Sequence, residues 1–199
     1  MTGDRDTIAF YDGNADDYAS FAAESAEHPK LEAFIALMPP EAKVLDLGCG
    51  IGWAAAAFRD AGFRIDAMDA SAGLVAKARE LYGIEARRAA FRTLSARSRY
   101  DGIWCHFALQ HAERPERPQI FERIHTALRP GGLVYIGVQK GPMDWRDDFG
   151  RLYCPFRDED MAALLDDAGL TDHRFEYGTG KNYDGTPTLG LYVWARKNA

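Results

Sequence analysis

Cysteine is scarce in this chain of 199 residues: there are three, an odd number, and they are widely spaced. They are Cys49, Cys105 and Cys154. A disulfide-built scaffold needs paired cysteines, and a structural zinc site needs them in short clusters, so the spacing argues against both. The pattern indicates reduced thiols in a cytoplasmic protein and predicts no metal site.

Long apolar runs and basic clusters are also missing. No apolar stretch approaches the roughly 20 residues that span a bilayer, and the acidic N-terminus lacks the basic and apolar regions of a signal peptide. Lys and Arg number 24 against 30 Asp and Glu, and the densest basic run, at 87–99, is interleaved with alanine. Such a run is more typical of a solvated surface than of a polyanion site. We therefore expect neither a membrane nor a nucleic-acid partner.

The most informative feature of the chain is a strand that turns through three alternating glycines into a helix. Residues 44–53 read V-L-D-L-G-C-G-I-G-W, with Asp46 inside the strand. The three glycines are Gly48, Gly50 and Gly52. Glycines at such a turn let the backbone approach a ligand, and the helix that follows presents free N–H groups. A second strand, 64–68, ends on Asp69, where a carboxylate can accept hydrogen bonds from ribose hydroxyls. Together these features predict a nucleotide-like cofactor.

Two details argue against a nicotinamide cofactor. The third glycine of its G-x-G-x-x-G turn would fall on Trp53, and the Asp46 carboxylate would repel a pyrophosphate at short range. A cofactor with ammonium and sulfonium groups and no phosphate removes this objection. The stretch resembles the glycine loop of the class I S-adenosylmethionine-dependent methyltransferases, and a nicotinamide-dependent oxidoreductase becomes a distant alternative.

A second, independent motif carries the same resemblance. Residues 100–106 (YDGIWCH) look like the fourth strand of that family, and 107–111 resemble the "xxLxH" segment that follows it. Residues 129–136 (RPGGLVYI) match the "LxPGGxLxI" hallmark, in which a helix ends and the fifth strand begins. The resemblance implies an α/β fold, a Rossmann-like three-layer α/β/α sandwich. Its seven-stranded, mostly parallel sheet would have the order 3-2-1-4-5-7-6 with strand seven antiparallel.

Periodicity and turn residues locate the elements. Helices are predicted at 14–23, 30–37, 53–60, 72–81, 118–128 and 161–168. Strands are predicted at 43–47, 64–68, 86–90, 100–106, 174–177 and 189–195, with the fifth beginning near Leu133. The segment 141–156 fits neither period and is expected to form a loop or short helix over the carboxyl edge of the sheet. Residues 1–199 should form one domain, with a helical cap at 1–40, a cofactor-binding core at 41–138 and a C-terminal part at 139–199.

The resemblance implies S-adenosylmethionine as the cofactor and suggests which residues contact it. The glycine loop supplies Asp46, Gly48, Cys49, Gly50 and Gly52, and the tip of the second strand supplies Asp69 and Ala70. His106, at the tip of the fourth strand, faces either the methionine part of the cofactor or the substrate.

Two further cofactor contacts have competing interpretations. Tyr11 and Tyr18 belong to a stretch that looks like the "fYDxxAxxY" opening of small-molecule members of the family, but their spacing is equally typical of a helix packed on a sheet. Many relatives carry an acid after the third strand that binds adenine, and 89–94 read A-A-F-R-T-L instead. Backbone groups would then hold the adenine with Phe91 packed against the ring, and an ordinary core role for Phe91 is as consistent.

His111 is the candidate general base, because it lies in the loop where the substrate pocket of the family opens and because histidine titrates near neutrality. If His111 is the base, the reaction rate should fall as the pH drops below a histidine pKa near 6.5. A structural histidine bonded to a backbone carbonyl is the competing interpretation.

These observations predict an S-adenosylmethionine-dependent methyltransferase (EC 2.1.1.-) that acts on a small molecule by in-line displacement and releases S-adenosylhomocysteine. The competing class is a non-catalytic S-adenosylmethionine-binding domain. An aromatic pocket with two nearby arginines hints at an anionic or planar acceptor. These residues are Tyr11, Trp145, Tyr153 and Phe156, with Arg146 and Arg151.

Overall fold

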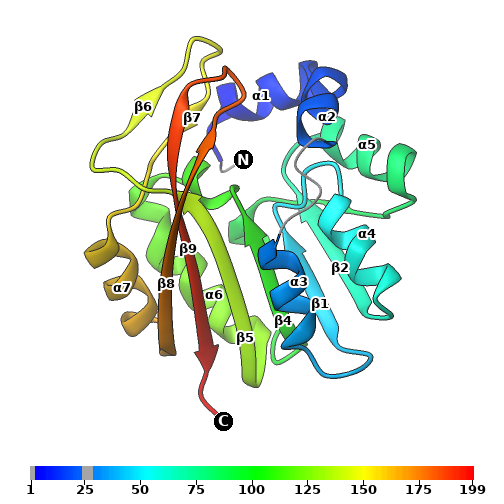
Figure 1. The fold of residues 1–199 in the computed structure, drawn as a ribbon, viewed down its shortest axis with the longest axis vertical. Helices are drawn as coiled ribbons and strands as arrows, with labels where there is room; N and C mark the ends of the chain where they lie inside the picture. The colour runs from blue at the N-terminus through cyan, green and yellow to red at the C-terminus, as the bar shows by residue number, and fades with distance from the viewer. Residues whose placement is uncertain (1–2, 24–28) are drawn as a thin grey trace.

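The computed structural model describes residues 3–23 and 29–199 and contains a seven-stranded sheet with helices on both faces (Figure 1). The strands, in their order across the sheet, are β3 (Arg87–Arg88), β2 (Arg64–Asp69), β1 (Lys43–Leu47), β4 (Tyr100–His106), β5 (Leu128–Gln139), β9 (Pro187–Lys197) and β8 (Leu170–Lys181). Neighbouring strands from β3 to β5 are parallel, whereas β9 pairs antiparallel with both β5 and β8. Counted along the chain within this sheet, the order is 3-2-1-4-5-7-6, so the expected topology is confirmed.

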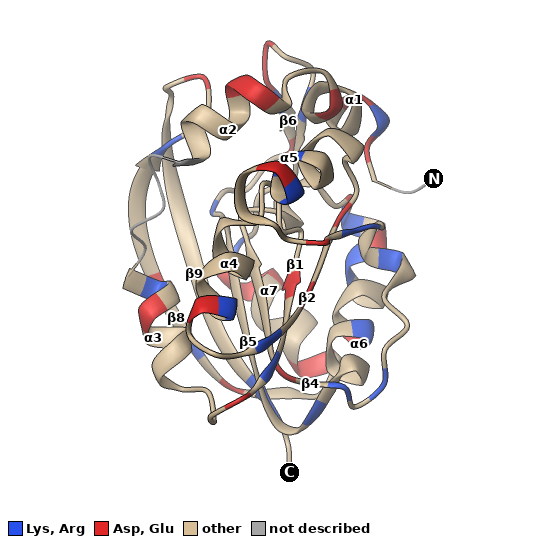
Figure 2. Ribbon diagram, turned by 90° about the vertical axis from the view of Figure 1, so that its right-hand side faces the viewer, with Lys and Arg blue, Asp and Glu red and all other residues tan. Residues whose placement is uncertain are grey.

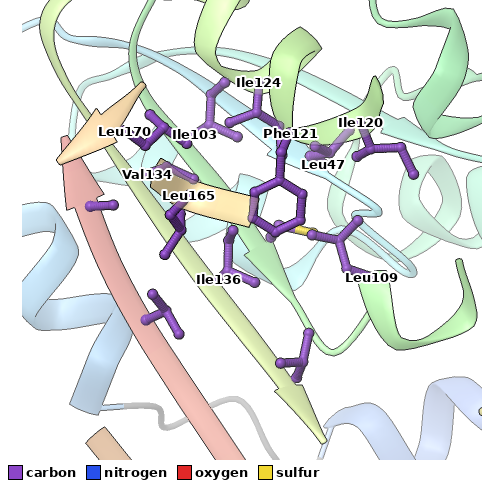
Figure 3. Packing of buried hydrophobic residues seen from close by; sticks show 14 of the residues in the cluster. Leu47, Ile103, Leu109, Ile120, Phe121, Ile124, Val134, Ile136, Leu165 and Leu170 are labelled. Atoms are coloured by element: carbon purple, nitrogen blue, oxygen red, sulfur yellow. The ribbon is translucent and has the colours of Figure 1, made fainter. Parts of the chain in front are cut away.

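Helices cover the two faces of the sheet in two groups. The α-helices are α1 (Arg5–Gly13), α2 (Ala15–Ala23), α3 (Pro29–Ala36), α4 (Trp53–Asp60), α5 (Ala72–Tyr82), α6 (Arg117–Ala127) and α7 (Asp158–Asp167). Apolar side chains of α3, α4 and α5 pack on one face, and those of α6 and α7 pack on the other. Figure 3 shows the second contact, where Phe121 of α6 lies against Ile136 and its neighbours on the sheet. Burying each such side chain contributes about 1.5–3 kcal/mol to the stability of the folded state.

The central strands are buried on both faces, which fixes where a ligand can bind. Residues 132–139 of β5 are all buried, and β4 is buried from Gly102 to Cys105. A parallel sheet covered in this way leaves only its strand ends open, and the chain reverses its strand order between β1 and β4. The carboxyl ends of β1, β2 and β4 are therefore the natural place for a cleft.

The local caps explain the boundaries of α4 and α5. Gly52 is the N-cap of α4 with a φ of 83°, and the Ser71 hydroxyl accepts a hydrogen bond from Leu74 N at the start of α5. Gly83, with a φ of 65°, ends α5 in the left-handed conformation that favours glycine. These positions agree with the sequence prediction to within one residue.

Several segments differ from the prediction, among them β5, which begins at Leu128 rather than near Leu133. The helix α1 was missed, because its start signal, Asp4 capping Thr7 N, precedes a mostly polar stretch. The edge strand β3 contains only two exposed residues, and the chain then turns into the 3₁₀ helix η1 (Phe91–Thr93). Strands β8 and β9 are longer than predicted, because their ends pair with each other and have little apolar pattern.

The segment 141–156 also differs, because it forms a small hairpin instead of the expected loop or short helix. Its strands are β6 (Trp145–Arg146) and β7 (Leu152–Tyr153), paired antiparallel. Asp147 closes the turn, since its Oδ1 accepts hydrogen bonds from Phe149 N and Arg151 N. As predicted, the segment lies near the carboxyl edge of the sheet, beside α1 (Figure 1).

Charge is distributed over the surface helices without a single-sign pattern common to them. Figure 2 shows acidic residues on α2, whereas α6 carries residues of both signs. Among the residues that the structure describes, no helix is long and apolar enough to cross a membrane. The three cysteines are free and buried.

Candidate functional site

Three adjoining cavities open at the carboxyl ends of β1, β2 and β4. The first cavity is lined by Tyr11, Tyr18, Gly48, Gly50, Asp69, Ala70, Phe91, His106, Phe107 and His111, among others. The second, of about 270 Å³, is lined by residues that include Tyr11, Tyr18, His106, Phe107, Gln139, Arg151, Tyr153, Lys181 and Asn182. The third is smaller and is lined by residues that include Tyr18, Asp46, Gly48, Cys49, Gly50, Trp53 and His106. The structure thus brings together eleven of the twelve residues predicted from the sequence.

The remaining predicted residue, Gly52, has a packing role. A Cβ at Gly52 would lie 3.0 Å from the Ala78 Cβ, so the glycine lets α4 and α5 approach each other. A direct contact between Gly52 and a cofactor stays a prediction.

The glycine loop has one open face. Gly48 and Gly50 have φ values of 78° and 53°, which L side chains rarely adopt. A Cβ at Gly48 would clash with Ala108, 2.4 Å away, whereas a Cβ at Gly50 would meet no atom within 4 Å. Gly50 therefore offers bare backbone to the first and third cavities.

Asp69 connects this loop to the start of α5. Its Oδ2 accepts a hydrogen bond from Gly50 N, and its Oδ1 accepts one from Ser71 N, both at 2.9 Å. Burial raises the pKa of Asp69, although these amide hydrogen bonds oppose the shift. Each oxygen retains a lone pair, so the carboxyl group can accept further hydrogen bonds in the first cavity.

Asp46 is a buried carboxyl group on the wall of the third cavity. It is 2% exposed, and its Oδ2 accepts a hydrogen bond from Ala55 N in the first turn of α4, at 3.1 Å. Burial raises the pKa of Asp46 to about 8 against the opposing hydrogen bond from Ala55 N, and a nearby cation would lower the pKa. Burial also raises the pKa of the neighbouring Cys49 thiol well above its usual range, so Cys49 is not a nucleophile at neutral pH.

The helix α1 forms a roof over the first cavity and is tied down at both ends. At its start, Asp4 pairs with Arg146 on β6. At its end, Asp12 Oδ1 accepts hydrogen bonds from Ser71 Oγ at 2.6 Å and from Gly73 N at 3.1 Å. A Cβ on Gly73 would lie 2.9 Å from the Asp12 carbonyl oxygen, so α1 rests directly on α5.

A directional chain of hydrogen bonds runs under this roof through His111. The His111 Nδ1 lies 2.6 Å from the Leu152 carbonyl oxygen, so it must carry the proton and donate it. The Nε2 is then an acceptor, and it lies 3.2 Å from the Tyr11 hydroxyl, which accepts in turn from Arg151 Nη1 at 3.2 Å. Burial lowers the pKa of His111 to about 4, so the pKa near 6.5 expected from the sequence is wrong for this site.

At the tip of β4, the chain passes through a strained residue that the sequence did not reveal. Phe107 has a φ of 50°, uncommon for an aromatic residue, and its N–H donates to the Gly137 carbonyl at 2.7 Å. It lines the first and second cavities beside His106, whose ring stacks on Trp104 and whose Nδ1 lies 3.2 Å from the Tyr135 hydroxyl. No sequence pattern marks such a conformation outside glycine.

The aromatic pocket expected from the sequence is partly confirmed. Tyr11, Tyr153 and Arg151 line the second cavity. Trp145 stacks behind Tyr153 with ring centroids 4.4 Å apart, and Arg146 pairs with Asp4 instead. Phe156 is wholly buried and belongs to the core. Within residues 3–23 and 29–199, no group of three or more His, Cys, Asp or Glu side chains is arranged to hold a metal ion.

Comparison with known sequences identifies the domain. A family of proteins described as a methyltransferase domain matches residues 44–132, from β1 to the early part of β5. A trans-aconitate 2-methyltransferase of Deinococcus radiodurans is 34% identical over 130 residues, which cover 63% of this chain and 48% of that protein. A malonyl-[acyl-carrier protein] O-methyltransferase of Enterobacter lignolyticus is 31% identical over 109 residues, or 52% of this chain and 42% of the relative. The chain therefore spans less than half the length of either relative.

Comparison with solved structures supports the same fold. The 1,6-didemethyltoxoflavin-N1-methyltransferase of Burkholderia thailandensis, solved with 1,6-didemethyltoxoflavin and S-adenosylhomocysteine, superposes with a TM-score of 0.78 at 24% identity. The superposition covers 98% of this chain and 88% of that one. Residues 44–132 thus resemble a methyltransferase domain, and the chain as a whole shares the fold of a solved methyltransferase.

Proposed function

We propose that this chain binds S-adenosylmethionine in the first and third cavities and methylates a small-molecule acceptor held in the second. The observation that carries this proposal is the pairing of an open glycine face at Gly50 with two carboxyl groups, Asp46 and Asp69, beside a separate cavity. The relatives are named as methyltransferases of small molecules, one of which is linked to an acyl-carrier protein. A single domain of 1–199 fits this arrangement: within the expected cap, 1–40, the helix α1 roofs the first cavity, 41–138 form the cofactor-binding core, and 139–199 supply residues of the acceptor side. The three free thiols fit a cytoplasmic setting.

The residues present suit the chemistry of this cofactor. Asp69 would accept from the ribose hydroxyls, with Ala70 beside it, and the Asp46 carboxyl would balance the positive charge of the methionine ammonium. Phe91, half-buried on the wall of the first cavity, offers an aromatic face to the adenine. S-adenosylmethionine held there would supply an electrophilic methyl group on a sulfonium, with S-adenosylhomocysteine as the leaving group.

The chain itself positions the two reactants, excludes water from them and supplies a group that can accept a proton. Four residues line both the first and the second cavity and form the wall between them: Tyr11, Tyr18, His106 and Phe107. Because α1 roofs this wall, it excludes water and orients the two reactants. Burial keeps His111 neutral, and the hydrogen bond to Leu152 places its proton on Nδ1, so Nε2 can take the proton of an acceptor that arrives protonated, through Tyr11.

Two measurements on the wild-type protein test this function. Isothermal titration should show binding of S-adenosylhomocysteine and none of reduced nicotinamide cofactor. Transfer of a labelled methyl group across a panel of small acceptors should then separate an enzyme from a non-catalytic binding domain. Failure of the first measurement rejects the cofactor site, and failure of the second alone favours the binding domain.

Replacing Asp69 tests the ribose contact. Asp69→Ala is expected to weaken S-adenosylhomocysteine binding by about 2–3 kcal/mol, because a charged acceptor of two hydroxyl hydrogen bonds is lost. Asp69→Asn is the matched control, since its amide oxygen can still accept from Gly50 N or Ser71 N. Its loss of affinity should be smaller. A dissociation constant for Asp69→Ala within twofold of wild type would reject the assignment.

The raised pKa of Asp46 predicts that cofactor binding releases a proton. With a pKa of about 8, the Asp46 carboxyl is mostly protonated at pH 7 in the free protein. A neighbouring ammonium stabilises the carboxylate, so the pKa falls on binding and the proton leaves. Titration of S-adenosylhomocysteine at pH 7 in buffers of different ionisation enthalpy should report this release, which should shrink in Asp46→Asn. Equal proton release by the two proteins would assign the proton to another group.

A further inference from the structure

The second cavity differs from its neighbours in charge. Among the described residues that line it are two cations, Arg151 and Lys181, and no Asp or Glu. The described linings of the first and third cavities show the opposite, with Asp4 and Asp69 in one, Asp46 in the other, and no Lys or Arg. The positive charge of the second cavity thus contrasts with the net charge of −6 that the whole chain carries. The second cavity therefore favours an anion, and the other two favour a cation.

Arg151 is built into this cavity in an unusual way for an arginine. Its side chain is 1% exposed, and aromatic rings surround the guanidinium. These rings belong to Phe10, Tyr11, Phe149, Tyr153 and Tyr183, with centroids 4.6–5.8 Å from the guanidinium carbon. Burying this charge is costly, and the guanidinium is paired with the buried carboxylate of Asp147 while it also lines the cavity.

The hydrogen bonds of the guanidinium leave donors for a ligand. Nε donates to Asp147 Oδ2 at 2.7 Å, and Nη1 donates to the Tyr11 hydroxyl at 3.2 Å. Nη2 lies 2.7 Å from the same Asp147 oxygen but makes no hydrogen bond of good geometry, although it is buried. The Asp147 carboxylate is itself saturated, because Oδ1 accepts two backbone amides. Of the four N–H groups on Nη1 and Nη2, the one donated to Tyr11 makes a hydrogen bond of good geometry, so the guanidinium has more donors than partners among the described residues.

Resting on the proposed function, we infer that the acceptor molecule carries a carboxylate, which Arg151 and Lys181 hold in the second cavity. Arg151 and Lys181 line neither of the other two cavities, so this carboxylate would anchor the acceptor in the second cavity, outside the proposed cofactor site. The nucleophile of the same molecule then faces the shared wall of Tyr11 and His106. The planar fork of a guanidinium matches a carboxylate, and the ring-lined cavity of about 270 Å³ suits a small unsaturated or aryl acid.

Matched pairs of small molecules test this inference. With S-adenosylhomocysteine bound, benzoate and fumarate are titrated against their neutral amides, benzamide and fumaramide, and phenyl phosphate is titrated as a second anion. At least one carboxylate should bind about tenfold or more tightly than its amide, because charge-assisted hydrogen bonds are lost in the amide. Equal affinities within a pair, or no carboxylate binding at millimolar concentration, overturn the inference. A preference for phenyl phosphate by tenfold overturns the carboxylate in favour of a phosphate monoester.

Variants of Arg151 and Lys181 test whether these two side chains hold the carboxylate. Arg151→Met alone would leave Asp147 buried without its partner, so it is combined with Asp147→Asn, which removes both charges and keeps their volume. This double variant should lose the carboxylate preference by about tenfold or more, and Lys181→Gln, at an exposed position that does not threaten folding, should lose about threefold. Arg97→Gln, an exposed site outside the three cavities, is the control for net charge and should bind like wild type.

The same titrations separate this inference from the function on which it rests. If S-adenosylhomocysteine binds but the carboxylate preference survives in both the double variant and Lys181→Gln, the anchor is wrong and the methyltransferase site stands. If S-adenosylhomocysteine does not bind to wild type, the proposed function fails. Should the double variant not fold, an unchanged preference in Lys181→Gln overturns the inference, and a reduced one supports it.

Discussion

Gly50→Val is expected to abolish binding of S-adenosylhomocysteine, with a loss of affinity beyond about a hundredfold. The reason is the open face of the glycine loop, where a Cβ at Gly50 meets no protein atom within 4 Å and points into the space that the cofactor would fill. A branched side chain occupies that space, and the φ of 53° adds backbone strain of about 1–3 kcal/mol. Isothermal titration measures the first effect, and thermal unfolding measures the second.

A substitution at a second glycine separates the effect of backbone strain on stability from the effect of a blocked cofactor site on binding. Gly62, just beyond α4, has a φ of 86°, and a Cβ there would likewise meet no atom within 4 Å, but it lies outside the three cavities. Gly62→Val should therefore lose a similar amount of stability and keep its affinity for S-adenosylhomocysteine. Retained binding in Gly50→Val, with normal folding, would count decisively against the glycine loop as the cofactor site.

His111→Ala is expected to lower turnover by about 10²–10⁴-fold, far more than it changes the affinity for S-adenosylhomocysteine, although His111 lines the first cavity. The variant removes the unprotonated Nε2 that the Leu152 carbonyl holds in place next to the Tyr11 hydroxyl. Turnover is measured by methyl transfer with the best acceptor from the panel. His125→Ala, which removes a histidine of α6 outside the cavities, is the control and should keep wild-type turnover.

The pH dependence of the rate gives a second test of His111. A base must be unprotonated to work, and burial lowers the pKa of His111 to about 4, so the wild-type rate should stay level down to about pH 5 and fall only as the pH approaches 4. A wild-type rate that halves near pH 6.5 would contradict this environment. If His111→Ala keeps most of its activity, the nucleophile reaches the site already as an anion and His111 is no base.

Most of the fold and the cofactor side of the site could be predicted from the sequence, because their signals are local. The alternating glycines, the acid at the end of β2 and the Ser71 cap each depend on a few adjacent residues. The strand order came from resemblance to a family. The helix α1 escaped prediction because its stability comes from contacts with distant residues, including Arg146 and Ser71.

The acceptor side could not be derived in the same way, because its chemistry depends on contacts between remote segments. The low pKa of His111 results from burial beneath α1 and the β6–β7 hairpin, which no neighbouring residue in the sequence announces. The setting of Arg151 is assembled from rings at both ends of the chain, such as Phe10 and Tyr183. The strained φ of Phe107 likewise follows from how β4 and β5 end together.

The way in which α1 is attached has a consequence for the rate at which ligands exchange. A helix of nine residues is barely stable alone, and α1 is held to its neighbours partly by polar contacts near the surface, each worth about 0.5–1.5 kcal/mol. The strands beneath it are held by the apolar core. Lifting the roof would break these contacts and those of the buried Phe10 but leave the sheet intact, so it would cost less free energy than global unfolding and would open a route for ligands.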